Sequence, residues 1–174
     1  MKRYGKEASC RSPILKEDVI KEKFIEAYNE IYDDRERILD KCGDMLSVLD
    51  DDNEIDAQIR QQILECEIIA GLNQDLVNEN ARTAMDQADV NAQYEAYAAR
   101  YEKEYEKLQQ LKRLKRERQS EATSLSAFMF QLHEREGFIT EFDDKLWMLT
   151  VDMVVVSHDG TLTFRFKNGS EVRK

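Results

Sequence analysis

Residues that interrupt helices are scarce in this sequence: its 174 residues include one proline and six glycines. No apolar run approaches the ~20 residues that a membrane-spanning helix needs. The first seven residues, Met1 to Glu7, have no apolar core of the kind found in a signal peptide. These absences predict a protein built from long helices, without membrane contact and located in the cytoplasm.

The residue types that build catalytic and metal sites are also scarce. The three cysteines, Cys10, Cys42 and Cys66, are widely spaced and form no CxxC pair. Neither histidine, His133 or His158, has a cysteine or a carboxylate at metal-ligand spacing. The sequence has no glycine-rich phosphate loop and no serine in a nucleophile-elbow setting. We therefore expect no enzyme activity, no cofactor and no metal within these residues.

Charged residues make up 36% of the chain and give it a net charge of −10. This acidic balance argues against nucleic-acid binding by the whole surface. One basic segment that could contact DNA lies at the start of the chain and contains Lys2, Arg3, Lys6 and Arg11. A second, Lys112–Arg118, is predicted to be a solvated helix face, with phosphate contact as the alternative.

The stretch from Asn53 to Glu117 has the pattern of two long helices folded against each other. In its second half, apolar residues recur three and four apart among many charges, with one interruption at Glu104, as in a coiled-coil strand. This seam consists of Tyr94, Tyr97, Tyr101, Leu108 and Leu111. The first half carries a looser stripe, and the pattern weakens between residues 78 and 89, which predicts a bend. The alternative is ordinary core in a helical bundle.

Helices and then strands are predicted around this hairpin. One helix should run from Lys16 to about Leu49, another from Thr123 to Glu136, and a short one should carry Leu146 and Trp147. The last residues alternate between apolar and polar with period two, which predicts strands. Hairpin turn signals stand at Asp159-Gly160 and Asn168-Gly169.

The predicted fold class is α+β and mostly helical. A long antiparallel coiled-coil arm should project from a small body of helices and a C-terminal three-stranded antiparallel sheet. About 28 residues per helix give an arm of roughly 40 Å. The expected organisation is a remnant or linker at 1–15, a body helix at 16–52, the arm at 53–122 and the completing helices and strands at 123–174.

The order of several short stretches resembles the C-terminal region of the large serine recombinases, the site-specific integrases of prophages and mobile elements. The stretches are Cys10–Ser12, Asn78–Ala81, Asp86–Gln87, Tyr94, Arg100–Glu102, Glu141–Trp147, Val151–Asp152, Asp159–Gly160, Phe164–Lys167 and Gly169. Cys10 stands where that family has the last cysteine of its zinc ribbon.

The resemblance implies a parent protein that cuts and rejoins two DNA sites through a serine nucleophile in an N-terminal catalytic domain. A recombinase domain and a zinc ribbon would bind the attachment-site DNA. The coiled-coil arm would hold subunits together in the synaptic complex and help to determine whether the protein integrates or excises DNA. A directionality factor would be a further partner. This chain lacks the catalytic domain, the recombinase domain and the upstream zinc cysteines. We therefore expect a fragment without bound zinc and with weak affinity for DNA, the structural zinc belonging to the full-length parent.

The expected partner surface is the far end of the arm, about Asn80 to Tyr94, where Met85, Val90 and Tyr94 supply apolar side chains. The alternative is that these residues only close the bend. A rival function, from a different class, is a free-standing coiled-coil adaptor or scaffold.

Overall fold

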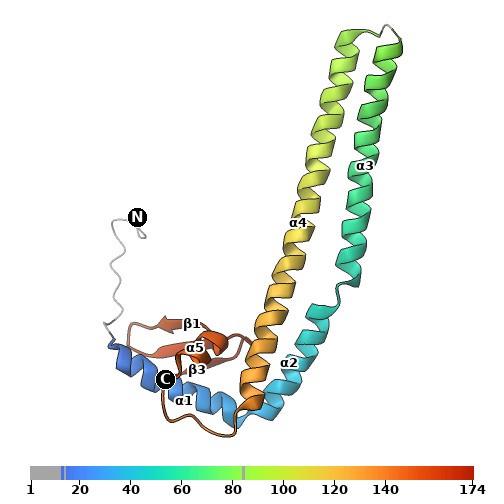
Figure 1. Cartoon of the computed structure of the whole chain (residues 1–174). Helices are drawn as coiled ribbons and strands as arrows, with labels where there is room; N and C mark the ends of the chain where they lie inside the picture. The colour runs from blue at the N-terminus through green and yellow to red at the C-terminus, as the bar shows by residue number, and fades with distance from the viewer. Residues whose placement is uncertain (1–12, 14, 84) are drawn as a thin grey trace. The chain divides into compact units, whose positions relative to one another are not determined.

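The computed structural model describes residue 13 and residues 15–83 and 85–174. These contain five α-helices and one three-stranded antiparallel sheet (Figure 1). The predicted fold class is confirmed as α+β, mostly helical, with a long antiparallel helix pair and a C-terminal sheet. Within this part of the chain, no helix combines the length and apolar character needed to cross a bilayer.

The chain divides into two compact units. The hairpin unit is Leu49–Ser120. The sheet unit consists of the described residues up to Val48 together with Glu121–Lys174.

The first helical stretch of the chain forms two helices, α1 (Glu17–Asp33) and α2 (Arg35–Asp50). The prediction of one helix from Lys16 to Leu49 was therefore wrong. The break lies at Asp34, whose φ of −101° and ψ of 19° leave the helical region. Its carboxylate accepts a hydrogen bond from Arg37 Nε at 2.9 Å in the first turn of α2. A carboxylate is favourable at the start of a helix, which suits an aspartate to the position before α2.

The C-terminal part of the sheet unit contains α5 (Asp144–Thr150) and the strands β1 (Val151–Val156), β2 (Leu162–Phe166) and β3 (Glu171–Arg173). The strand order is β1-β2-β3, and both pairings are antiparallel. Gly160 and Gly169 adopt φ values of +88° and +81° in the two connecting turns. Because side chains disfavour this region of φ, glycine suits both positions, as the turn signals predicted.

The core of the sheet unit is an aromatic cluster beneath β2. The Phe24 ring of α1 lies 5.0 Å from the Trp147 ring and 6.4 Å from the Phe164 ring, centroid to centroid. Phe128, near the end of α4, approaches Phe166 at 6.5 Å. Trp147 belongs to the short helix α5, and α1 and the end of α4 supply further rings.

Asp143 caps the short helix α5. Its Oδ1 accepts a hydrogen bond from the Leu146 amide at 3.0 Å, and its Oδ2 accepts one from Arg135 at 2.8 Å. The Leu146 amide, followed by the Arg135 guanidinium, lowers the pKa of Asp143 from its ordinary value of 3.8. The ionised carboxylate therefore stabilises the fold above that value, and the contribution is lost as the pH falls through the lower, folded-state pKa.

We expect Asp143→Ala to reduce the free energy of unfolding at pH 7 by about 1 to 2 kcal/mol, because a cap and an ion pair are lost. Denaturant titrations at several pH values would measure this, and the difference from the wild type should shrink below pH 3.8. The neighbouring, exposed Asp144 is the control, since its replacement by alanine should change stability by less than about 0.5 kcal/mol. A loss that is the same at pH 7 and in strong acid would contradict the role of the charge.

The hairpin unit is formed by α3 (Asn53–Arg82) and the first part of α4 (Gln87–Glu134). Figure 1 shows the two helices side by side, joined by a short turn in the region where the sequence predicted a bend. Their contact buries Ile55, Cys66, Ile69, Leu76, Val90 and Leu108. Glu104, the predicted interruption of the seam, lies opposite Gln62, which donates to the Glu104 carbonyl at 3.0 Å and to its carboxylate at 2.8 Å.

α4 continues without a break to Glu134, so the separate helix predicted from Thr123 to Glu136 was wrong. Between Glu117 and Thr123 the sequence contains neither glycine nor proline, and nothing in it interrupts the helical hydrogen bonds.

Candidate protein-interaction surface

Two helices can cover only one side of each other, and the hairpin unit leaves many large apolar side chains in contact with solvent. Those more than a third exposed are Leu64, Ile68, Leu72, Val77, Tyr94, Tyr101, Tyr105 and Leu114. Single exposed apolar residues are normal on a protein surface, but a contiguous group marks a candidate binding site.

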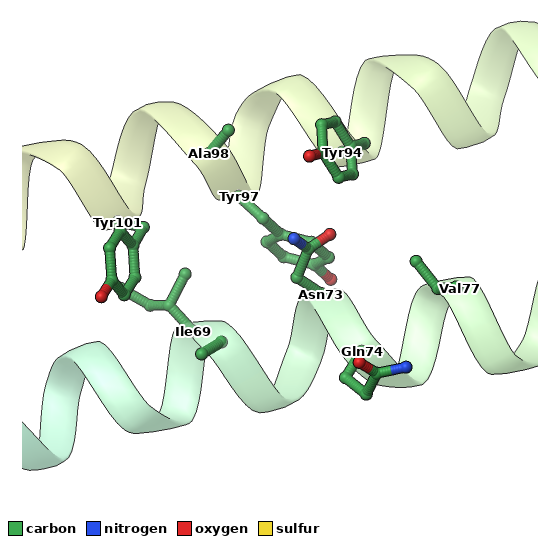
Figure 2. Close-up of a pocket in the computed structure, with 9 residues that line it drawn as sticks. Ile69, Asn73, Gln74, Val77, Tyr94, Tyr97, Ala98 and Tyr101 are labelled. Carbon is green, nitrogen blue, oxygen red and sulfur yellow. The ribbon is translucent and has the colours of Figure 1, made fainter.

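One such group surrounds a hollow of about 370 Å³ between α3 and α4. We call it the tyrosine groove (Figure 2). Its lining residues are Ile69, Ala70, Asn73, Gln74, Val77, Tyr94, Tyr97, Ala98 and Tyr101. None of these nine residues is charged, although charged residues make up 36% of the chain. Helix faces exposed only to water would be expected to carry charges at the usual density, so the groove is set apart from its surroundings.

The groove follows from helix geometry. Tyr94, Ala98 and Tyr101 are four and three residues apart and therefore share one face of α4. Ala70 and Val77 on α3 are seven apart and lie on one face in the same way. The two alanines are too small to fill the space between the helices. Figure 2 shows Tyr97 and Tyr101 reaching from α4 toward α3, with Tyr97 beside Asn73.

The groove offers aromatic surface together with a few polar groups. The rings of Tyr101 and Tyr105 are stacked, with centroids 6.0 Å apart and planes inclined by 10°, so the aromatic surface extends one turn beyond the groove. Asn73 Oδ1 is buried and has no hydrogen-bond partner in the described structure. A buried acceptor without a partner is costly, and a ligand that supplied a donor would relieve that cost. Tyrosine suits interfaces because its ring is apolar and its hydroxyl can still form a hydrogen bond.

The three predicted tip residues do not form one surface. Val90 is 9% exposed and packs within the seam between α3 and α4. Met85 is half-buried in the turn, and its carbonyl accepts a hydrogen bond from Gln87 at 3.2 Å. Tyr94 alone belongs to the tyrosine groove.

Tyr94 and Tyr101 were also predicted to lie in the buried seam. They are 50% and 39% exposed and lie at its edge. Sequence reasoning therefore named these tyrosines but missed the groove. The signal that could have revealed it is the absence of charge at positions 94, 98, 101 and 105, which share a side of α4.

Residues of the second basic segment, Lys112–Arg118, form ion pairs and hydrogen bonds with the acidic start of α3 and the residues just before it. Lys115 Nζ lies 2.6 Å from Asp56 and 3.3 Å from Asp52. Arg118 donates to the carbonyl of Asp51 at 3.1 Å. Because these cations already have partners within the hairpin unit, fewer are available for phosphate. The predicted DNA-binding residues Lys2, Arg3, Lys6 and Arg11, and the ribbon-like Cys10, lie outside the described residues.

Within the part of the chain that the structure describes, no three histidine, cysteine or acidic side chains are grouped so that they could hold a metal ion. Cys42 and Cys66 are buried. Burial raises the pKa of the Cys42 thiol, which disfavours the reactive thiolate. No protein-family model, curated protein or solved structure matches this chain.

Proposed function

We propose that this chain is a protein–protein interaction module whose tyrosine groove binds an apolar helix of a partner protein. The observation that carries the proposal is the uncharged, tyrosine-lined groove on two otherwise highly charged helices. A groove between two antiparallel helices fits a third helix, because side chains of an added helix can pack between the rows of both. The partner helix should present apolar side chains and at least one donor near Asn73.

We further propose that the parent protein is a serine site-specific recombinase in which the hairpin unit contacts another subunit while two attachment sites are held together. The order of the sequence stretches that resemble that family supports this. In this proposal DNA binding and structural zinc belong to the full-length parent, and a directionality factor is a second candidate occupant of the groove.

The alternative proposal is a free-standing adaptor, which would have no recombinase catalytic domain attached to it. The coding sequence upstream of Met1 distinguishes this adaptor from the recombinase module. A continuous reading frame that encodes a serine-recombinase catalytic domain and the missing ribbon cysteines would support the recombinase module. A native start codon at Met1 with no such frame upstream would contradict it. The groove would then serve a different partner, and the interaction proposal would stand without the recombinase.

We expect Ala98→Arg to reduce recombination by the full-length parent at least ~30-fold, the loss typical of a disrupted interface hot spot. The arginine would fill the groove and place a charge without a partner among tyrosines. A recombination assay between two attachment sites would measure the effect, and circular dichroism would check that the helices remain.

Ala96→Arg is the matched control, because Ala96 is an exposed alanine of the same helix that does not line the groove. The control should recombine at the wild-type rate. Equal activity of the two variants would show that the groove does not bind a partner needed for recombination.

A further inference from the structure

The sheet has two edge strands, and they differ in how they are protected. β3 is three residues long and exposes two charges, Glu171 and Arg173, which discourage pairing with another chain. β1 is six residues long, and its stretch from Met153 to Val156 carries no charge. Within the described residues β1 pairs only with β2, so its outer edge has no strand neighbour. A long, uncharged strand edge readily pairs with another strand.

The side chains of β1 add to this edge. Met153 and Val155 project on the same face and are 45% and 47% exposed. Val154 and Val156 alternate with them and are half-buried. The edge therefore offers both unpaired backbone groups and apolar side chains, and the partner that matches both is another apolar strand.

We propose that β1 pairs antiparallel with β1 of a second copy of this chain, which joins two three-stranded sheets into one sheet of six strands. A two-fold axis through Val154 would place Met153 of each copy opposite Val155 of the other. Directly opposed residues in an antiparallel pair lie on the same face, so the two exposed apolar side chains would cover each other. The same strand would serve both sides of the contact, as a two-fold interface requires.

The charges near β1 are compatible with this pairing. Asp152, the charged residue of the strand, precedes the residues that would pair across the axis, and it already lies 3.7 Å from Arg165 of β2. The register of β1 with β2 shifts between Val151 and Met153. Such an irregularity limits regular pairing to the residues that follow it. The contact is therefore short, and the dimer should form with rising protein concentration rather than permanently.

The test uses the whole chain carrying Ala98→Arg, so that association through the tyrosine groove does not contribute. The mass in solution is measured by sedimentation across a concentration series at ~0.15 M salt. The background chain should shift from the mass of one chain to that of two. Adding Met153→Lys and Val155→Lys places lysines opposite each other twice and should weaken the dimer at least ~10-fold.

The charge-swapped pair, Met153→Glu with Val155→Lys, is the matched control. It removes the same apolar side chains but places opposite charges across the axis, so it should dimerise more tightly than the double-lysine variant. Trp147 fluorescence would show that all variants are folded. A background chain that stays monomeric at every concentration would overturn the β1 pairing, as would equal dimerisation of the two charge variants. Neither outcome would bear on the proposed role of the tyrosine groove, which Ala98→Arg tests separately in the recombination assay.

A second measurement checks the register. Val154→Cys in a Cys10→Ser background should yield a covalent dimer on mild oxidation, because residues at a two-fold axis face each other within disulfide range. Glu171→Cys on the edge strand β3 should not. Cross-linking at position 171 but not at 154 would contradict the proposed axis.

Discussion

Replacing Phe164 by alanine is expected to lower the free energy of unfolding of the sheet unit by about 3 to 5 kcal/mol. Phe164 lies at the centre of β2, is fully buried and packs against two other rings. Its centroid lies 6.4 Å from that of Phe24 and 6.1 Å from that of Trp147. Removing the ring would leave a cavity between α1, α5 and the sheet, and hydrogen bonds to other segments of the sheet unit limit how far α1 can move in to fill it. Tyr32 of α1, for example, donates to the carbonyl of Arg135 at 2.9 Å.

Trp147 allows the loss of stability caused by Phe164→Ala to be measured in the sheet unit itself. It is the single tryptophan of the chain, so its fluorescence during a denaturant titration reports on the sheet unit. Phe130→Ala is the matched control, because that ring is 60% exposed and its removal should cost less than about 0.5 kcal/mol. Similar losses for the two variants would mean that the aromatic cluster does not stabilise the unit as described.

Replacing Asn29 by alanine should have the second largest effect, a loss of about 2 to 4 kcal/mol, because two backbone groups would lose their partners. Asn29 Nδ2 donates to the carbonyl of Ile139 at 2.9 Å, and the Ile139 amide donates to Asn29 Oδ1 at 2.8 Å. The side-chain amide thus pairs with the backbone of Ile139 as a neighbouring strand would. Ile139 is buried, so water does not readily replace either bond.

The same fluorescence titration would measure this effect, with Asn29→Asp as an informative companion. Aspartate keeps the acceptor for the Ile139 amide but turns its second oxygen toward the Ile139 carbonyl, so it should not restore stability. Ser126→Ala is the control, since Ser126 is exposed on α4 in the sheet unit that Trp147 reports on. If Asn29→Ala were as mild as Ser126→Ala, the segment around Ile139 would be held by packing alone.

Local patterns were sufficient to predict most of the fold. The alternation of Leu162, Phe164 and Phe166 with polar residues predicted a half-buried strand, and the two glycine turns fixed its neighbours. The end of the first helical stretch was not predictable in the same way. Asp34 breaks the helix through its own backbone conformation and its contact with Arg37, whereas the apolar period continues across it from Ile31 to Ile38.

The candidate site was harder to predict, because helix spacing does not distinguish the centre of a seam from its edge. Tyr94 and Tyr101 recur at the spacing of buried seam residues, and only the position of α3 decides how much of each ring is covered. The groove also depends on two small side chains, because Ala70 and Ala98 leave space that a larger residue would fill. No sequence pattern predicts that the side-chain oxygen of Asn73 lacks a hydrogen-bond partner. The interaction surface therefore emerges only when both helices are in place.

The contact between Gln62 and Glu104 restricts how the hairpin can change in length. These two polar residues satisfy each other within an otherwise apolar seam, and sliding one helix past the other would leave both facing apolar side chains. An insertion or deletion between this contact and the turn is therefore tolerated only when both helices change by the same number of residues, in steps close to seven. Related proteins should accordingly differ in hairpin length by matched heptads, while a one-sided change would force the turn to bulge.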